Sequence, residues 1–202
     1  MFFVEFNDYM RYNQWYQNHS LWSYSMLLFI KKHSYDMVKM LINQLAISIF
    51  GNALALATGE TQQGLRIVTS VFSVLFYLFL IYVMMWDMGA KDAHHLERKD
   101  AGYTRFAGLY ISLCASILNF AFAILVTLGT LISTLGNVGG VAKLLALLFE
   151  GMFTGLLAIT VNGTPLNNLW WIYFLLPLPL ILTATIAYLA GMKNFKLFSV
   201  KK

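Results

Sequence analysis

The sequence predicts an all-α protein, a helical bundle that crosses a lipid bilayer several times. Of its 202 residues, 59% are hydrophobic. Only 11% are charged, against roughly 25% in an ordinary soluble domain. Twelve of the fourteen Lys and Arg residues lie in three segments, 1–39, 87–105 and 193–202, and long uncharged runs separate these segments. A water-soluble fold of this length could not cover its surface with so few charges, so lipid is the expected solvent.

The N-terminal segment, residues 1–39, is predicted to lie on the cytoplasmic surface of the membrane. Aromatic residues alternate here with Asn and Gln, and Phe2, Phe6, Tyr9 and Tyr12 recur at nearly helical spacing. This pattern is typical of a helix in the headgroup zone. Tyr and Trp are also enriched at protein interfaces, so binding of a partner protein is the alternative.

The membrane bundle is predicted over residues 40–192, beginning with spans at 40–58 and 67–86. Both runs are uncharged and have about the 20 residues that a helix needs to cross the hydrocarbon core. The polar sequence GETQQGLR separates them, so the two spans should form a helical hairpin.

Two further spans are expected at 107–129 and 169–192. Residues 106–142 are uncharged and exceed the length of one crossing, so the Ser, Thr and Gly-rich remainder should emerge from the membrane. The last span begins Leu169-Trp170-Trp171, and such aromatics favour the headgroup level. Pro177 and Pro179 should bend this span.

Residues 141–161 are apolar but contain Lys143 and Glu150, so apolarity alone does not decide whether they cross the membrane. The distribution of the basic residues over the two sides of the membrane is the further criterion. With four spans, the N-terminal segment, the loop 87–105 and the basic tail 193–202 share the cytoplasmic side, as the positive-inside rule favours. A fifth span would move the four lysines of the tail outside. The sequence therefore favours four spans with an outer re-entrant or interfacial helix at 141–161; five spans is the alternative.

Two spans carry narrow polar faces with residues spaced by three or four. The residues concerned are Gln44, Ser48 and Asn52 in the first span, and Ser112, Ser116 and Asn119 in the third. Such faces are typical of places where membrane helices pack and form hydrogen bonds. The alternative is a polar pathway through the bundle.

Glu150 is the one acidic residue in a strongly apolar segment, and Lys143 precedes it by about two helical turns. A buried carboxylate there could bind a cation or relay protons. In an interfacial helix, however, both charges would face water, and this is the interpretation that the four-span topology favours.

The second and last spans end in a similar way. Trp86, Gly89 and Lys91 match Tyr188, Gly191 and Lys193 in type and spacing. The match is consistent with a duplicated hairpin. Convergence is the preferred interpretation, because an interfacial aromatic residue, a Gly and a basic residue suit any span that ends on the cytoplasmic side.

The loop 87–105 contains the only candidate metal ligands, His94, His95, Glu97 and Asp100. The signal is weak because adjacent histidines diverge on a helix and no second cluster completes the set. No metal, cofactor or catalytic residue is therefore predicted.

The sequence indicates a membrane environment more clearly than a function. Basic residues flank apolar runs, which favours contact with lipid headgroups over nucleic acid. We expect a bacterial plasma-membrane protein with both termini in the cytoplasm. The first hypothesis is a non-enzymatic subunit or accessory component that binds another membrane protein or copies of itself. The second is an oligomeric transporter or channel for a small solute or ion, and the third is a membrane-embedded metal-binding protein or enzyme.

Overall fold

The computed structural model confirms the all-α bundle. It describes residues 2–58, 62–98, 100 and 103–194, with the backbone alone for residues 2–25 and 133. Within this part of the chain, three helices are long and apolar enough to cross a membrane. Two bent helix pairs could each be a broken span or a re-entrant loop, so the number of candidate spans lies between three and five. The predicted basic tail lies outside the described residues from position 195 onward.

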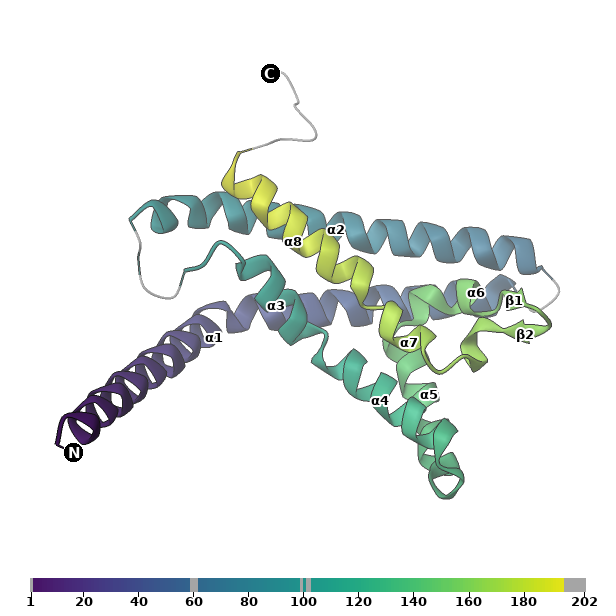
Figure 1. Ribbon diagram of the computed structural model, residues 1–202. Helices are drawn as coiled ribbons and strands as arrows, with labels where there is room; N and C mark the ends of the chain where they lie inside the picture. The colour runs from purple at the N-terminus through teal and green to yellow at the C-terminus, as the bar shows by residue number, and fades with distance from the viewer. Residues whose placement is uncertain (1, 59–61, 99, 101–102, 195–202) are drawn as a thin grey trace, which may run out of the picture.

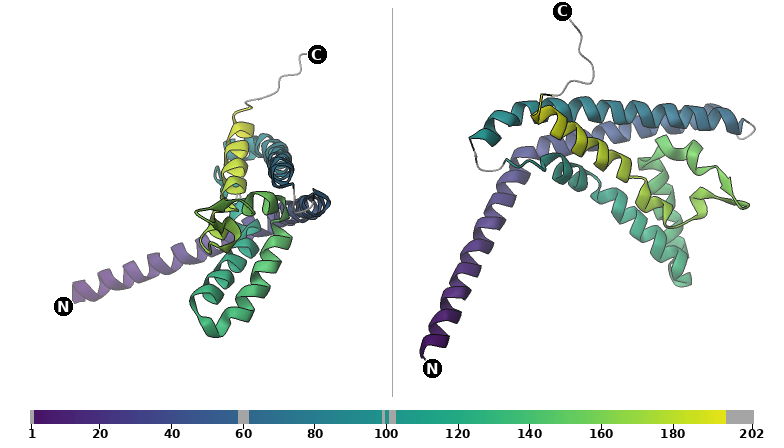
Figure 2. Two further views of the ribbon diagram at one scale, coloured as in Figure 1. Left: turned by 90° about the vertical axis from the view of Figure 1, so that its right-hand side faces the viewer. Right: turned by 45° about the horizontal axis from the view of Figure 1, so that its top comes forward.

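Helices α1 (Phe2–Thr58) and α2 (Gln63–Glu97) form the predicted hairpin (Figure 1). The structure joins residues 2–39 of the N-terminal segment and the first predicted span into one helix of 57 residues, about 85 Å long at about 1.5 Å per residue. Its N-terminal part extends away from the other helices in all views (Figures 1 and 2). The side chains of the predicted aromatic pattern between Phe2 and Tyr16 lie outside the described side chains.

Helix α2 continues eleven residues beyond the predicted span 67–86, and Asp87 and Lys91 form an ion pair of 2.5 Å along the surface of this extension. The predicted loop 87–105 is therefore helical as far as Glu97. The face of α2 that carries Tyr77, Ile81 and Met85 is buried in the bundle.

The third predicted span is broken into α3 (Ala107–Ala115) and α4 (Ile117–Leu131), with a bend of 48°. Two local features accompany the bend. The hydroxyl of Ser112 donates to the carbonyl oxygen of Gly108 at 2.8 Å, and the N–H of Ser116 is shared between the carbonyls of Ser112 and Leu113. Such local bonds compete with the regular helical pattern and often bend helices.

A second helical hairpin joins α4 to α5 (Gly136–Phe149) through the short 3₁₀ helix η1 (Ser133–Leu135). Gly129 and Gly139 meet where these helices cross, and a Cβ atom on either would overlap the other residue's backbone. Small residues at such crossings allow membrane helices to approach closely.

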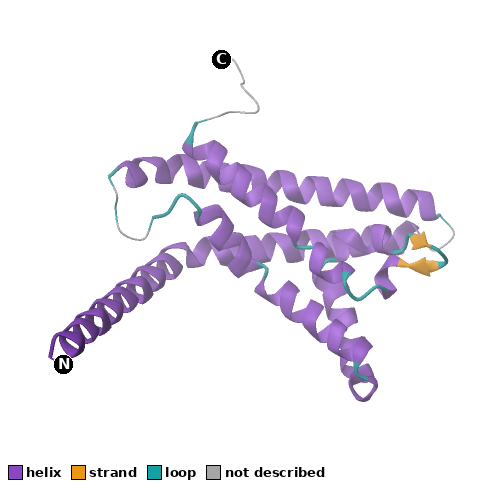
Figure 3. Cartoon of the chain, viewed as in Figure 1, coloured by secondary structure: helices purple, strands orange, loops and turns teal. Residues whose placement is uncertain are grey.

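After α5 the chain turns sharply into η2 (Gly151–Phe153) and α6 (Thr154–Leu157), with an angle of 87° between the helices on either side of the break. The segment 141–161 is therefore bent, as in a re-entrant loop or a broken span. The strands β1 (Thr160–Val161) and β2 (Thr164–Pro165) follow as a small antiparallel hairpin. Figure 3 places this hairpin near the end of the bundle where α1 turns into α2.

The chain ends with η3 (Leu166–Asn168), α7 (Ile172–Leu175) and α8 (Leu178–Met192). The predicted interruption at Pro177 lies between α7 and α8. The two similar span ends pack against each other. A Cβ atom on Gly89 would overlap the backbone of Tyr188, and one on Gly191 would overlap the backbone of Trp86. The shared spacing of the aromatic residue and the glycine thus produces a reciprocal contact between α2 and α8.

Candidate functional site

The break after α5 is held by the polar face of α1. The amide nitrogen Nε2 of Gln44 donates to the carbonyl oxygen of Phe149 at 3.3 Å, and the hydroxyl of Ser48 donates to the same oxygen. Asn52 Nδ2 donates to the carbonyl oxygen of Leu147 at 3.2 Å. The last carbonyls of a helix lack partners within the helix, so α1 supplies the donors that this buried end requires.

Side chains from α1 and α2 also hold the segment that follows the break. Thr154 donates from its hydroxyl to Asn52 Oδ1 at 2.9 Å. The Ser70 hydroxyl donates to the carbonyl oxygen of Met152 at 2.5 Å and accepts from the N–H of Leu156 at 3.4 Å. The backbone on both sides of the break is therefore fixed by hydrogen bonds from the first two helices.

Glu150 occupies the break itself. Its N–H still donates to the carbonyl oxygen of Ala146 at 2.8 Å, but its φ and ψ of −118° and 28° are not helical. Its side chain is 3% exposed. Glu150 is therefore buried inside the protein, and the expectation that it faces water is wrong.

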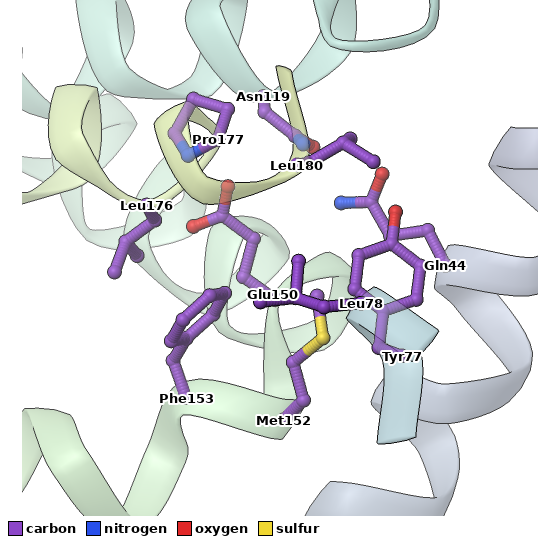
Figure 4. A pocket seen from close by; sticks show the side chains of 10 residues that line it. All are labelled: Gln44, Tyr77, Leu78, Asn119, Glu150, Met152, Phe153, Leu176, Pro177 and Leu180. Atoms are coloured by element: carbon purple, nitrogen blue, oxygen red, sulfur yellow. The ribbon is translucent and has the colours of Figure 1, made fainter. Parts of the chain in front are cut away.

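The Glu150 side chain lies in a small chamber that Figure 4 shows in close view. Polar side chains enter this chamber from three other helices: Gln44 from α1, Tyr77 from α2 and Asn119 from α4. The remaining walls are apolar and consist of Leu78, Met152, Phe153, Leu176, Pro177 and Leu180. The centre of a water-sized sphere can move within about 10 Å³ inside the chamber. This volume is at the lower limit of the space that one water molecule needs.

Four oxygen atoms of this chamber have no hydrogen-bond partner among the described residues. They are Gln44 Oε1, Tyr77 Oη, Asn119 Oδ1 and Glu150 Oε2, and none of the four side chains is more than 3% exposed. Buried polar atoms without a partner are rare and unfavourable, and each requires an explanation. The arrangement can bind a cation or a proton among these oxygens.

Lys143 does not pair with Glu150, although the helical spacing placed both on one face. Its ammonium group donates to Asn168 Oδ1 at 2.7 Å, and its side chain is half-buried. The bend at Glu150 turns the carboxylate into the bundle and leaves Lys143 near the chain that follows the β-hairpin.

The polar residues predicted from the sequence have different roles. Gln44 and Asn119 reach the chamber of Glu150, whereas Ser48 and Asn52 bind backbone carbonyls. Ser112 bonds within its own helix, and the Ser116 hydroxyl is buried without a partner in the described structure.

Tyr77 is the chamber residue that the sequence analysis missed. The available signal was a phenol in the middle of an apolar span, because a buried Tyr hydroxyl normally needs a partner.

The four candidate metal ligands form two separate pairs. His95 Nδ1 lies 2.9 Å from Asp100 Oδ2, and the exposed His94 lies 4.0 Å from Glu97. The His95 ring also stacks on Tyr103, with 4.3 Å between ring centroids. The hydrogen bond from His95 lowers the pKa of Asp100. Across the described residues, no three His, Cys, Asp or Glu side chains come together as a metal site requires.

Comparison with protein-family models, with curated proteins and with solved structures finds no match for this chain. The function is therefore inferred from the chamber and its surroundings.

Proposed function

We propose that the protein is a multi-pass membrane transporter or channel for a small cation, and that Glu150 is the charged group on the route. The observation that carries the proposal is the burial of this carboxylate at a helix break, beside unpartnered amide and phenol oxygens. Ionisable residues inside membrane bundles commonly mark ion pathways. Broken helices form the ion sites of many transporters, because the interrupted backbone and the side chains beside it converge there.

The proposed topology has four spans, with the bent segment 136–157 entering the bundle from the outer face. Both termini then lie in the cytoplasm, and the membrane is a bacterial plasma membrane. The distribution of twelve basic residues over three segments supports this orientation. Four spans enclose little volume, so we propose that the pathway forms in a homo-oligomer.

The test is cation flux into liposomes that contain the purified protein. Three probes report the flux of small monovalent cations: a trapped pH-sensitive dye for protons, ²²Na⁺ and ⁸⁶Rb⁺. At least one flux should exceed that of protein-free liposomes, and Glu150→Gln should reduce it about tenfold or more, since loss of a required charge removes the site. If all three fluxes equal those of protein-free liposomes, the proposal is wrong.

A second candidate is a subunit of a larger membrane complex, and one observation favours it. The N-terminal part of α1 extends beyond the other helices (Figure 1) and so leaves a long helical surface for a partner. Purification in mild detergent tests this function. A stoichiometric second protein that is lost when residues 2–25 are deleted would support it, whereas a preparation of this chain alone would contradict it.

A further inference from the structure

We infer that the chamber around Glu150 is a binding site for a dehydrated monovalent metal cation of the size of Na⁺. The inference rests on the proposed function and specifies the ion that the site recognises. Its ligands would be Gln44 Oε1, Asn119 Oδ1, Glu150 Oε2 and the hydroxyl oxygen of Tyr77, which come from four different segments of the chain.

The chemistry of these atoms selects a hard cation. All four are oxygens, and carboxylate, amide and hydroxyl oxygens are ligands of hard metal ions. The lining contains one sulfur atom, that of Met152, and no imidazole. Soft metals such as Cu(I) favour several sulfur ligands, so this ligand set does not suit them.

The hydrogen bond of Gln44 to the end of α5 leaves its amide oxygen without a partner in the described structure. Its nitrogen Nε2 donates to the carbonyl oxygen of Phe149 at 3.3 Å. Because a carbonyl can only accept, the amide nitrogen must occupy that side and the oxygen Oε1 must point elsewhere. The same helix end that fixes Gln44 also presents the negative end of the α5 dipole, which favours a positive charge nearby.

The charge of the chamber selects a monovalent ion. Glu150 is the only carboxylic acid among the lining residues, and no Lys, Arg or His lines the chamber. One monovalent cation would neutralise the carboxylate. A divalent cation would leave a net positive charge among apolar walls, which is strongly unfavourable.

A metal ion can contact the acceptor atoms of the chamber together. Gln44 Oε1, Asn119 Oδ1 and the ionised Glu150 Oε2 can only accept hydrogen bonds. A metal cation can contact all three and the hydroxyl oxygen of Tyr77 as well, whereas one water molecule has two hydrogens to donate and matches all three only when the Tyr77 hydroxyl donates to one of them. The chamber is small, because the centre of a water-sized sphere can move within only about 10 Å³. It therefore holds one small ion or molecule at a time.

The test is binding of Na⁺ to the intact protein in detergent, measured apart from transport. The protein is purified in choline chloride, and NaCl replaces choline at constant ionic strength. Thermal unfolding should shift upward with Na⁺ in a saturable way, because a ligand that binds only the folded state stabilises it. KCl should give a smaller shift, and equilibrium dialysis with ²²Na⁺ should give about one ion per chain, as the single small chamber requires.

Two variants and a matched control locate the site. Asn119→Leu should weaken Na⁺ binding about tenfold or more, and Glu150→Gln should abolish the shift, as loss of ligands or of their supporting contacts typically costs that much affinity. Asn43→Leu is the control, because Asn43 is also an amide within a span but does not line the chamber. It should bind Na⁺ like the unchanged protein.

Several results would overturn the inference: no saturable response of the unchanged protein to Na⁺, an equal response to K⁺ and choline, or unaltered binding by Asn119→Leu. A response to pH without a response to Na⁺ would assign the chamber to a proton instead. The titration of the unchanged protein keeps the test decisive if a variant fails to fold. Na⁺ binding without flux would refute the transport function alone, and flux without Na⁺ binding would refute the ion assignment alone.

Discussion

Asn52 and Thr154 are joined by a hydrogen bond of 2.9 Å, although 102 positions separate them in the chain. This bond links the first predicted span to the segment that follows the break at Glu150. Because the other side of the Asn52 amide binds Leu147, one side chain holds the backbone before the break and the segment after it.

Asn52→Leu should therefore destabilise the protein. The change removes two hydrogen bonds and leaves the Leu147 carbonyl without this donor, and we expect a loss of about 1–2 kcal/mol. The measurement is denaturant unfolding in detergent, followed by circular dichroism. Asn43→Leu serves as the control, since the amide of Asn43 makes a weak contact of 4.0 Å with the sulfur of Met84. Equal stability of the two variants would contradict the role given to Asn52.

Gly191→Ala should separate α2 from α8. A Cβ atom at this position would overlap the backbone of Trp86, so the helices must move apart, at a cost of about 1–3 kcal/mol. Gly140→Ala is a matched control within a helix, because nothing lies within 4 Å of the added atom. Thermal unfolding of both variants tests this, and Gly140→Ala should be neutral or slightly stabilising. If Gly191→Ala were as stable as Gly140→Ala, the close contact between α2 and α8 would be wrong.

The hydrogen bond between His95 and Asp100 should give the polar segment after α2 a specific pH dependence. It lowers the pKa of Asp100 below the ordinary value of 3.8. A group with a lowered folded-state pKa contributes stability above its unfolded value, and this contribution is lost as the pH falls through the folded value. Asp100→Asn should thus unfold at a lower temperature than the unchanged protein at about pH 6, and the difference should shrink as the pH falls from about 6 to about 3.

The comparison is made by thermal unfolding at matched ionic strength. Asp87→Asn provides a contrast, because Asp87 forms a surface ion pair with Lys91 within α2 and does not touch His95. A difference for Asp100→Asn that is constant between these pH values would show that ionisation of Asp100 has no part in it.

Much of the fold could be predicted, because long apolar runs and basic segments can be recognised along the chain without knowledge of which residues meet in space. The hairpin of α1 and α2 follows from two uncharged runs of spanning length with a polar turn between them, and the polar faces of Gln44 and Asn119 follow from periodicity. The bend at Ser116 could not be predicted, because it depends on which carbonyls the local N–H and hydroxyl groups select. The continuation of α2 to Glu97 was missed because charged residues suggested a loop, although they also suit a helix outside the hydrocarbon core.

The chamber could not be derived from the sequence for a different reason. Gln44, Tyr77, Asn119 and Glu150 share no local pattern, and the backbone bend of 87° alone decides that the carboxylate turns toward the other three. That bend in turn depends on hydrogen bonds from α1 to a helix about 100 positions later. The expectation that Lys143 and Glu150 share one face requires a continuous helix between them and beyond Glu150. The break at Glu150 ends that helix, so the expectation fails.

The most direct test of the account compares cation flux of Glu150→Gln and Glu97→Gln in liposomes with that of the unchanged protein. Both variants remove one carboxylate, but Glu150 is buried in the chamber whereas the side chain of Glu97 is 80% exposed. The account predicts that Glu97→Gln retains the flux and that Glu150→Gln loses about nine-tenths of it or more, since only the buried charge lies on the route. Full flux through a correctly folded Glu150→Gln protein would contradict the central role of this carboxylate.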